Sequence, residues 1–199
     1  TPQDITPIKD ANKLLPGYLM RYHLSGHYSL HCYWSYSSYC KHSTQMSPEE
    51  ITKQLDELLS RAVEEQHRDA PSASCFISGG IGSASIAHYL QGDKRTNLPT
   101  TAYSVSFTGE YPEDREACDI IADTLHLDYH PGVLNPSDLI HLMPKILWHL
   151  DEPLADPNIL LTWRLCEMAH GSPLIFTGMG SDELLGGHQR YLEEEPRHD

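Results

Sequence analysis

The sequence of 199 residues lacks the features that mark several classes of protein. No apolar run approaches the ~20 residues that a membrane-spanning helix needs, and no basic-then-apolar segment opens the chain. Lys and Arg number 14 against 28 Asp and Glu, for a formal net charge of −14. Such a charge repels nucleic-acid phosphate. We therefore expect neither a membrane nor a nucleic acid as partner.

Cysteine is also scarce. The chain has five cysteines, an odd number, which lie far apart and form no CxxC pair. This pattern argues against a disulfide framework and is typical of a reducing compartment, so we expect a cytoplasmic location. The thirteen histidines suggest a metal site, but His31-Cys32 and Cys40-x-His42 lack zinc-site spacing. We interpret them as surface or core residues. The chain begins with Thr1, so we expect it to be part of a longer protein.

The length suits one domain with an appendage. Residues 17–34 alternate around Ser25-Gly26, which predicts a β-hairpin within a linker and arm of residues 1–46, packed at the edge of the domain and outside the site. Ser47-Pro48-Glu49-Glu50 then has the pattern of a capping box and starts a long amphipathic helix. We assign residues 47–199 to a second, α/β region.

Strand and helix patterns alternate through that region. Strands are expected at 74–77, 101–107, 128–134 and 173–177, and helices at 83–91, 113–125, 136–150, 158–170 and from Asp182 onward. Such alternation predicts a Rossmann-like parallel sheet covered on both faces. Ligands of these sheets bind outside the carboxyl ends of the strands, which directs attention to the loops after Ile77, Phe107 and Thr177.

The loop SGGIGS, residues 78–83, lies between an expected strand and an expected helix. Glycines let the backbone approach a phosphate, and a helix N-terminus favours an anion. GxxxxGK[ST] is absent, so this is not a Walker loop. Taken alone, the glycines could equally serve strand–helix packing. A dinucleotide fingerprint over residues 80–85 is a further alternative, disfavoured because Ser106-Phe107-Thr108 supplies no acid after the second strand.

A second glycine-rich loop, TGMGSDELLGG, covers residues 177–187. Asp182 stands where it could cap the following helix or ligate Mg²⁺ that bridges phosphates. The acidic segment HLDEPLADP, residues 149–157, could be a helix stop and cap or a wall on the substrate side.

Together these motifs resemble a known family. SGGIGS is similar to the pyrophosphate loop of ATP pyrophosphatases, and residues 149–157 and 178–187 resemble the synthetase domain of glutamine-dependent asparagine synthetases. PGYL at 16–19 and YW at 33–34 resemble the segment that joins that family's glutaminase and synthetase domains.

The resemblance implies a sheet of adenine nucleotide α-hydrolase type. It also implies adenylation of a small-molecule carboxylate, aspartate in the namesake enzymes, with release of pyrophosphate. An amine then displaces AMP. The implied cofactors are ATP and Mg²⁺, and the implied ammonia source is a glutaminase domain that this sequence does not contain.

The resemblance carries over to individual residues by their position in the motifs. The resemblance implies that the pyrophosphate loop contains Ser78, Gly79, Gly80 and Ser83. It implies that adenine and ribose are lined by Phe76 and Val105, and that the AMP part is contacted by Thr177 and Gly178. It also implies that Asp182 binds Mg²⁺ and is catalytic.

The sequence departs from the family pattern at three places, two single residues and one run of three. Gly82 replaces an Asp that is a second Mg²⁺ ligand, Met179 replaces a Glu tied to the second half-reaction, and residues 129–131 replace His-His-Glu. Gly and Met can neither ligate Mg²⁺ nor transfer a proton. A catalytically impaired nucleotide-binding relative is therefore the alternative. We expect Gly82→Asp to raise pyrophosphate exchange and Asp182→Ala to abolish it.

Overall fold

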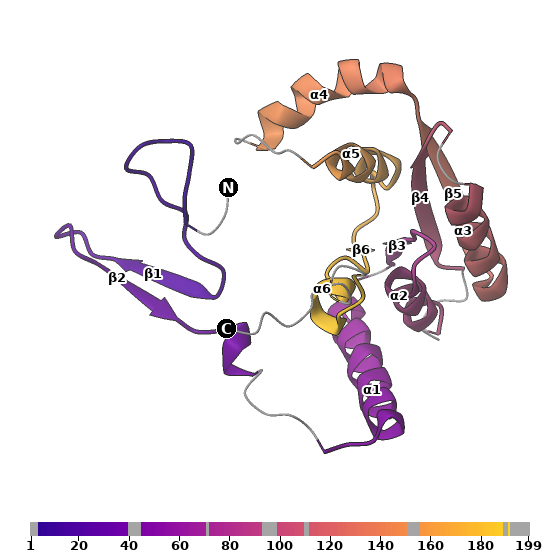
Figure 1. Ribbon diagram of the computed structural model, residues 1–199, viewed down its shortest axis with the longest axis horizontal. Coiled ribbons are helices and arrows are strands. Elements are labelled where there is room, and N and C mark those ends of the chain that lie inside the picture. The colour runs from indigo at the N-terminus through magenta and orange to yellow at the C-terminus, as the bar shows by residue number, and fades with distance from the viewer. Residues whose placement is uncertain are drawn as a thin grey trace.

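The computed structural model describes residues 4–39, 45–70, 72–92, 99–109, 112–150, 156–188 and 191. Its centre is a four-stranded parallel sheet of order β5-β4-β3-β6 (Figure 1). The strands are β3 (Ser74–Phe76), β4 (Thr101–Phe107), β5 (Asp128–Leu134) and β6 (Ile175–Phe176). The expected α/β fold with a parallel sheet is confirmed.

β4 and β5 have the expected bounds, whereas β3 and β6 are shorter than expected. The backbone of Ile77 still donates to Tyr103 O (2.9 Å), so pairing continues one residue past β3. At the start of β6, Pro173 has no N–H to donate to a ladder. The pairing of β6 with β3 therefore begins at Leu174, whose carbonyl oxygen accepts a hydrogen bond from Ser74 N (2.9 Å).

Helices cover both faces of the sheet (Figure 1). The helices α1 (Pro48–His67), α2 (Ile81–Gln91) and α3 (Pro112–Leu125) pack on one face, and α4 (Pro136–Leu150) and α5 (Asn158–Met168) pack on the other. Two hydrophobic cores result, the first under α1, α2 and α3 and the second under α4 and α5. Successive strand residues point to opposite faces of the sheet, so Ala102 belongs to the first core and Val105 to the second. No helix within the described ranges is long and apolar enough to span a bilayer.

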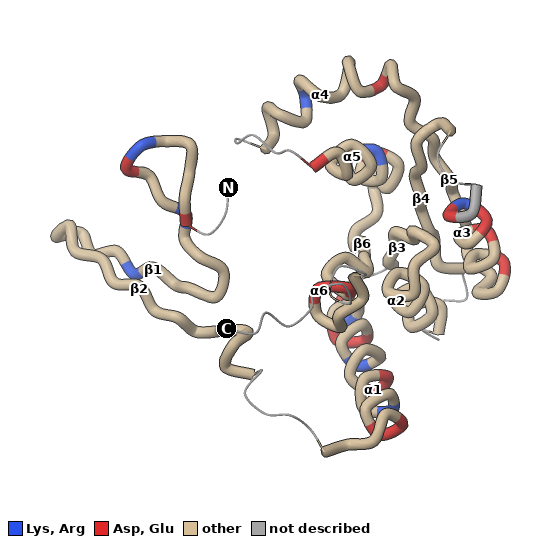
Figure 2. The backbone as a smooth tube through the Cα atoms, in the orientation of Figure 1, with Lys and Arg blue, Asp and Glu red and all other residues tan. Residues whose placement is uncertain are grey.

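The helix α1 begins as its sequence predicts. Glu50 N donates to Ser47 Oγ (3.3 Å), and Ser47 N donates to a Glu50 carboxylate oxygen (2.8 Å), which completes the capping box. Charged residues lie along the whole of α1 (Figure 2), and only Val63 and His67 are buried. Its outer surface is therefore a solvated face.

The expected hairpin is present, formed by β1 (Tyr18–Tyr22) and β2 (Tyr28–Cys32) in antiparallel pairing. Gly26 has φ +89° in its turn, a conformation that favours glycine. All residues of the two strands except Tyr18 are exposed, and the hairpin stands apart from the sheet (Figure 1). A short 3₁₀ turn, η1 (Tyr36–Ser38), follows it. The hairpin lies outside the site, as expected, but the expected packing against the edge of the domain is not seen among the described residues.

Candidate functional site

The two glycine-rich loops lie side by side at the carboxyl edge of the sheet. β3 and β6 pair in parallel, with Cys75 opposite Phe176, so their following loops leave the sheet together. The contact is so close that a Cβ added to Gly178 would lie 2.5 Å from Ser83 N and 2.6 Å from Gly82 C. The arrangement that the sequence predicts is therefore observed.

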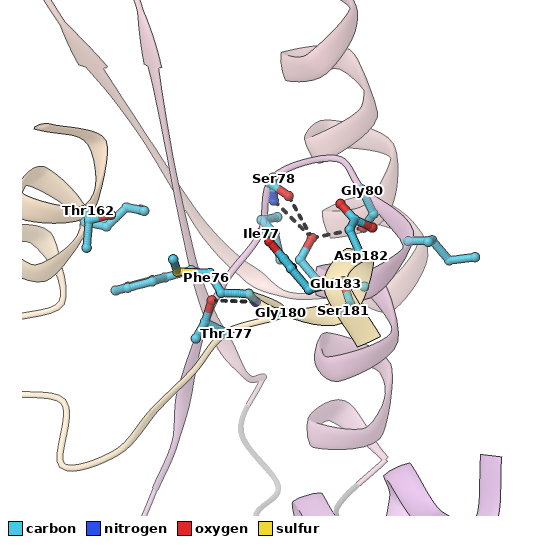
Figure 3. A pocket seen from close by; sticks show the side chains of 16 residues that line it. Phe76, Ile77, Ser78, Gly80, Thr162, Thr177, Gly180, Ser181, Asp182 and Glu183 are labelled. Atoms are coloured by element: carbon cyan, nitrogen blue, oxygen red, sulfur yellow. Dashed lines mark hydrogen bonds between the residues drawn. The ribbon is translucent and has the colours of Figure 1, made fainter. Parts of the chain in front are cut away.

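A pocket of about 350 Å³ opens between these loops (Figure 3). Most of the predicted binding residues line it, namely Phe76, Ser78, Gly80, Ser83, Thr177, Gly178 and Asp182. Ile77, Ile81, Gly82, Met179, Gly180, Ser181 and Glu183 complete the loop walls, and Thr162 and Leu165 enter from α5. Its volume is in the range of small-molecule sites.

Two predicted residues lie elsewhere. Gly79 has φ +79° and faces α3, where an added Cβ would lie 3.0 Å from both Ala117 Cβ and Asp114 O. Its glycine is required by the backbone conformation and by this close approach. Val105 packs in the second core against residues that include Leu134 and Leu160. Their roles in nucleotide binding remain predictions.

Ser83 fixes the shape of the first loop. Its side chain is buried, and its hydroxyl donates to Gly80 O (3.0 Å) while it accepts from Ser78 N (3.1 Å) (Figure 3). Ser78 Oγ lies 3.2 Å away and donates the remaining hydrogen bond, because the single Ser83 proton is already used. The loop is thus held in one conformation by its own residues.

The N-terminus of α2 completes an anion-binding surface. Its N-cap is Gly80, which has no side chain to cap the helix, and Ala84 N makes the first backbone bond to Gly80 O (3.1 Å). The preceding N–H groups of the first turn lack an acceptor within the helix. Those groups and the helix dipole favour a negatively charged ligand at this end of the pocket.

The second loop places Asp182 at the other side of the same space. Thr177 Oγ1 accepts from Met179 N (3.2 Å), and Gly180, with φ +90°, is the N-cap of the short helix α6 (Ser181–Leu185). No side chain caps α6, so the capping interpretation of Asp182 is wrong. Asp182 is exposed and lines the same pocket as Gly80 (Figure 3).

The residues present fit a magnesium ion held with phosphate. Mg²⁺ binds through one or two carboxylates together with phosphate oxygens and waters. Asp182 and Glu183 are the two acids among the described residues that line the pocket. The part of the chain that the structure describes holds no group of three or more potential metal-ligating side chains, so phosphate and water oxygens would complete the coordination.

Gly82 adds no acid, and Ser181 occupies the adjacent space. A Cβ at Gly82 would overlap Ser181 Oγ and lie 2.9 Å from Ser181 Cβ. A side chain at position 82 therefore requires the Ser181 side chain to shift, and the effect of Gly82→Asp on exchange remains a prediction.

The acidic segment after α4 is described only in part. α4 ends at Leu150, and residues 151–155 lie outside the described residues. An Asp156 carboxylate oxygen accepts from Asn158 N (3.0 Å) at the start of α5. The described end of the segment therefore starts a helix, and its role as a substrate wall remains a prediction.

Comparison with known protein families gives a match that includes both glycine-rich loops. The family model of asparagine synthase matches residues 54–199. The chain belongs to the asparagine synthase family. This match confirms the resemblance seen in the loops and favours it over the dinucleotide fingerprint.

Individual relatives share less than a third of their aligned residues with this chain. The chain is 27% identical over 150 residues to glutamine-hydrolyzing asparagine synthetase 1 of Bacillus subtilis, covering 75% of this chain and 23% of that protein. It is 29% identical over 204 residues to Amidase chry2 of Gibberella zeae, covering 94% and 30%. The structure of NMN synthetase from Francisella tularensis aligns with TM-score 0.48 and 20% identity, covering 74% of this chain and 61% of that one. The chain thus spans about a quarter to a third of the curated relatives' length.

Proposed function

We propose that this chain is the nucleotide-binding part of an ATP-dependent ligase that forms amides. A carboxylate oxygen of the substrate attacks the α-phosphorus of ATP, the bond from that phosphorus to the bridging oxygen breaks, and pyrophosphate leaves. An amine then attacks the acyl carbon of the adenylate, loses a proton and displaces AMP. The observation that carries the proposal is the contact of the two glycine-rich loops across one pocket.

The two loops suit different parts of this chemistry. The hydrogen bonds of Ser83 hold the first loop in place, and the N–H groups at the start of α2 present donors to the phosphates. Asp182 would hold Mg²⁺ on the opposite side, with Glu183 next to it. When bound, this ion neutralises the charge that builds up on the leaving pyrophosphate.

The second half-reaction needs groups beyond those that the pocket shows. Met179, which is 77% exposed, lines the pocket at the family's acidic position but cannot accept a proton. We propose a small carboxylate as substrate, aspartate being the first candidate, and ammonia from a glutaminase domain as the amine. The positions of Gly82 and Met179 also favour the alternative of a nucleotide-binding relative with impaired catalysis.

Pyrophosphate exchange into ATP in the full-length protein tests the proposal, with aspartate and other carboxylates as substrates. Asp182→Ala should abolish exchange while ATP binding survives through the first loop. Asp123→Ala, on the exposed surface of α3, is the matched control and should exchange as the native protein does. Native protein that binds ATP without exchange supports the impaired relative, and absence of ATP binding contradicts both proposals.

A second pair of variants tests the metal deficit at Gly82. Gly82→Asp should raise exchange, although the Ser181 side chain has to shift to admit the new side chain. Gly82→Asp combined with Ser181→Gly should raise exchange further, since the second carboxylate then reaches the metal without that shift. Ser181→Gly alone is the control. If the double variant exchanges no faster than this control, a missing second carboxylate does not limit the reaction.

A further inference from the structure

A second pocket, of about 470 Å³, opens at the amino edge of the sheet, where its strands begin. The first residues of two neighbouring strands line it, Ser74 of β3 and Thr101 of β4, which pair with each other. The glycine-rich loops instead follow the last residues of β3 and β6. The two pockets therefore lie at opposite ends of the strands.

Three helices end at this pocket. α1 ends at His67, α2 ends one residue after Leu90, and α5 ends two residues before His170, and all three of these residues line the pocket. The last carbonyl groups of a helix and its dipole give the C-terminus a partial negative charge, which favours a cation. Because α1 and α2 pack on one face of the sheet and α5 on the other, this charge reaches the pocket from both faces.

The side chains of the lining add oxygen acceptors. Five hydroxyl residues line the pocket, namely Ser72, Ser74, Thr100, Thr101 and Ser172. The hydroxyls of Ser74 and Ser172 share one hydrogen bond (2.9 Å), so lone pairs remain on both oxygens. Among its described residues the lining contains no Lys or Arg that would repel a cation, and no Asp or Glu. The pocket thus differs from the first one, whose helix N-terminus favours an anion.

We propose that the pocket at the amino edge is a binding site for a small aliphatic diamine in its doubly protonated form. An ammonium group has three N–H donors and no acceptor, which matches a lining of hydroxyl and carbonyl oxygens. Two ammonium groups on one carbon chain can meet the helix C-termini on both faces of the sheet. The volume is in the range of small-molecule sites, and the net charge of −14 attracts cations to the protein. The site is separate from the pocket proposed for ATP and does not depend on that function.

Calorimetric titration of the full-length protein at low ionic strength and mildly alkaline pH, where a free imidazole is neutral, tests the site. The probes have the same four-carbon chain and differ in charge: 1,4-diaminobutane, n-butylamine and 1,4-butanediol. The diamine should bind, n-butylamine should bind about tenfold more weakly, and the uncharged diol should not bind.

Charge variants locate the bound diamine. His170→Lys, at an exposed position of the lining, should weaken diamine binding by about threefold to tenfold through like-charge repulsion. At the exposed Ser72, Ser72→Lys should weaken binding and Ser72→Asp should tighten it. His141→Lys, on the exposed surface of α4, is the matched control and should bind the diamine as the native protein does. Asp182→Ala, which removes an acid from the other pocket, should also leave diamine binding unchanged.

The possible outcomes are distinct. Opposite effects of Ser72→Lys and Ser72→Asp, with no effect of His141→Lys, support the site. If His170→Lys and His141→Lys weaken binding equally, the diamine is attracted by the net charge alone and the assignment is wrong. If Asp182→Ala abolishes binding, the diamine occupies the first pocket, and the assignment is also wrong. Native protein that binds the diol as well as the diamine contradicts a cation site.

Discussion

The two glycine-rich loops share one edge of the sheet but are supported differently. The first follows β3, which has a neighbour on both sides, and leads into the eleven-residue helix α2, with the buried Ser83 bonded to three groups. The second follows the two-residue edge strand β6 and leads into the five-residue helix α6, which has no buried residue. The first loop is thus held by buried hydrogen bonds, whereas the second has an exposed bond from Met179 N to Thr177 Oγ1 and also packs closely against the first.

The largest expected effect comes from breaking that contact. Gly178→Ala would place a Cβ 2.5 Å from Ser83 N, and backbone atoms cannot swing aside as a side chain does. We expect the variant to lose about 1–3 kcal/mol of unfolding free energy and to lose ATP binding, because the loops must separate. Urea unfolding and an ATP titration measure the two effects.

Gly92→Ala is the control for adding a methyl group to a glycine. A Cβ at Gly92 would lie 3.5 Å from His88 O and 3.6 Å from Tyr89 O, which is ordinary van der Waals contact. This variant should be neutral or slightly more stable, with native ATP affinity. If Gly178→Ala also binds ATP normally, the second loop does not depend on the first.

The next effect concerns the bonds inside the first loop. Ser83→Ala removes the hydroxyl that accepts from Ser78 N and donates to Gly80 O. We expect a loss of about 1–3 kcal/mol in stability and about tenfold weaker ATP binding, because a buried donor loses its partner. Calorimetric unfolding and titration with ATP measure both.

Ser85→Ala provides the comparison for this loss. Its hydroxyl bonds only within α2, to Ile81 O (2.8 Å), so its removal should change ATP affinity little. Equal effects of the two serine variants would show that the first loop is not held by Ser83, and the contrast between the loops would disappear.

The difference between the loops also explains what the sequence could predict. The alternation of strands and helices, the capping box and the positions of both loops are local patterns, and the structure contains them. That the loops after β3 and β6 open at the same edge follows from the rule that parallel strands present their loops at one edge, whereas the pairing of β3 with the two-residue strand β6 is an observation of the structure. Motifs with a fixed place in such a fold are therefore visible before the structure.

Other parts of the site depend on tertiary packing and were missed. Thr162 and Leu165 follow only the helical pattern of α5, and nothing in their spacing distinguishes a pocket wall from a core face. The contact between Gly82 and Ser181 joins residues almost a hundred positions apart. The role of Asp182 is ambiguous in the sequence, since an acid at the start of a helix is as typical of an N-cap as of a metal ligand.

The smallest effect tests the remote support of the first loop. Tyr89, near the end of α2, donates through its hydroxyl to an Asp56 carboxylate oxygen of α1 (2.7 Å). Burial, with the hydrogen bond and charge of Asp56, raises the pKa of Tyr89 to about 12. Because the folded protein favours the protonated phenol, this contribution to stability is present below pH 10 and is lost as pH rises through about 12.

Tyr89→Phe should therefore lose about 1 kcal/mol of stability at neutral pH and keep native ATP affinity, since the Ser83 bonds lie at the opposite end of α2. The stability gap between native and variant protein should narrow from pH 10 to 12, as measured by urea unfolding at each pH. Tyr28→Phe, on the exposed hairpin, controls for loss of a phenol and should show no such gap. If Tyr89→Phe weakens ATP binding as much as Ser83→Ala, the first loop takes its shape from the packing of α1 on α2 rather than from its own hydrogen bonds.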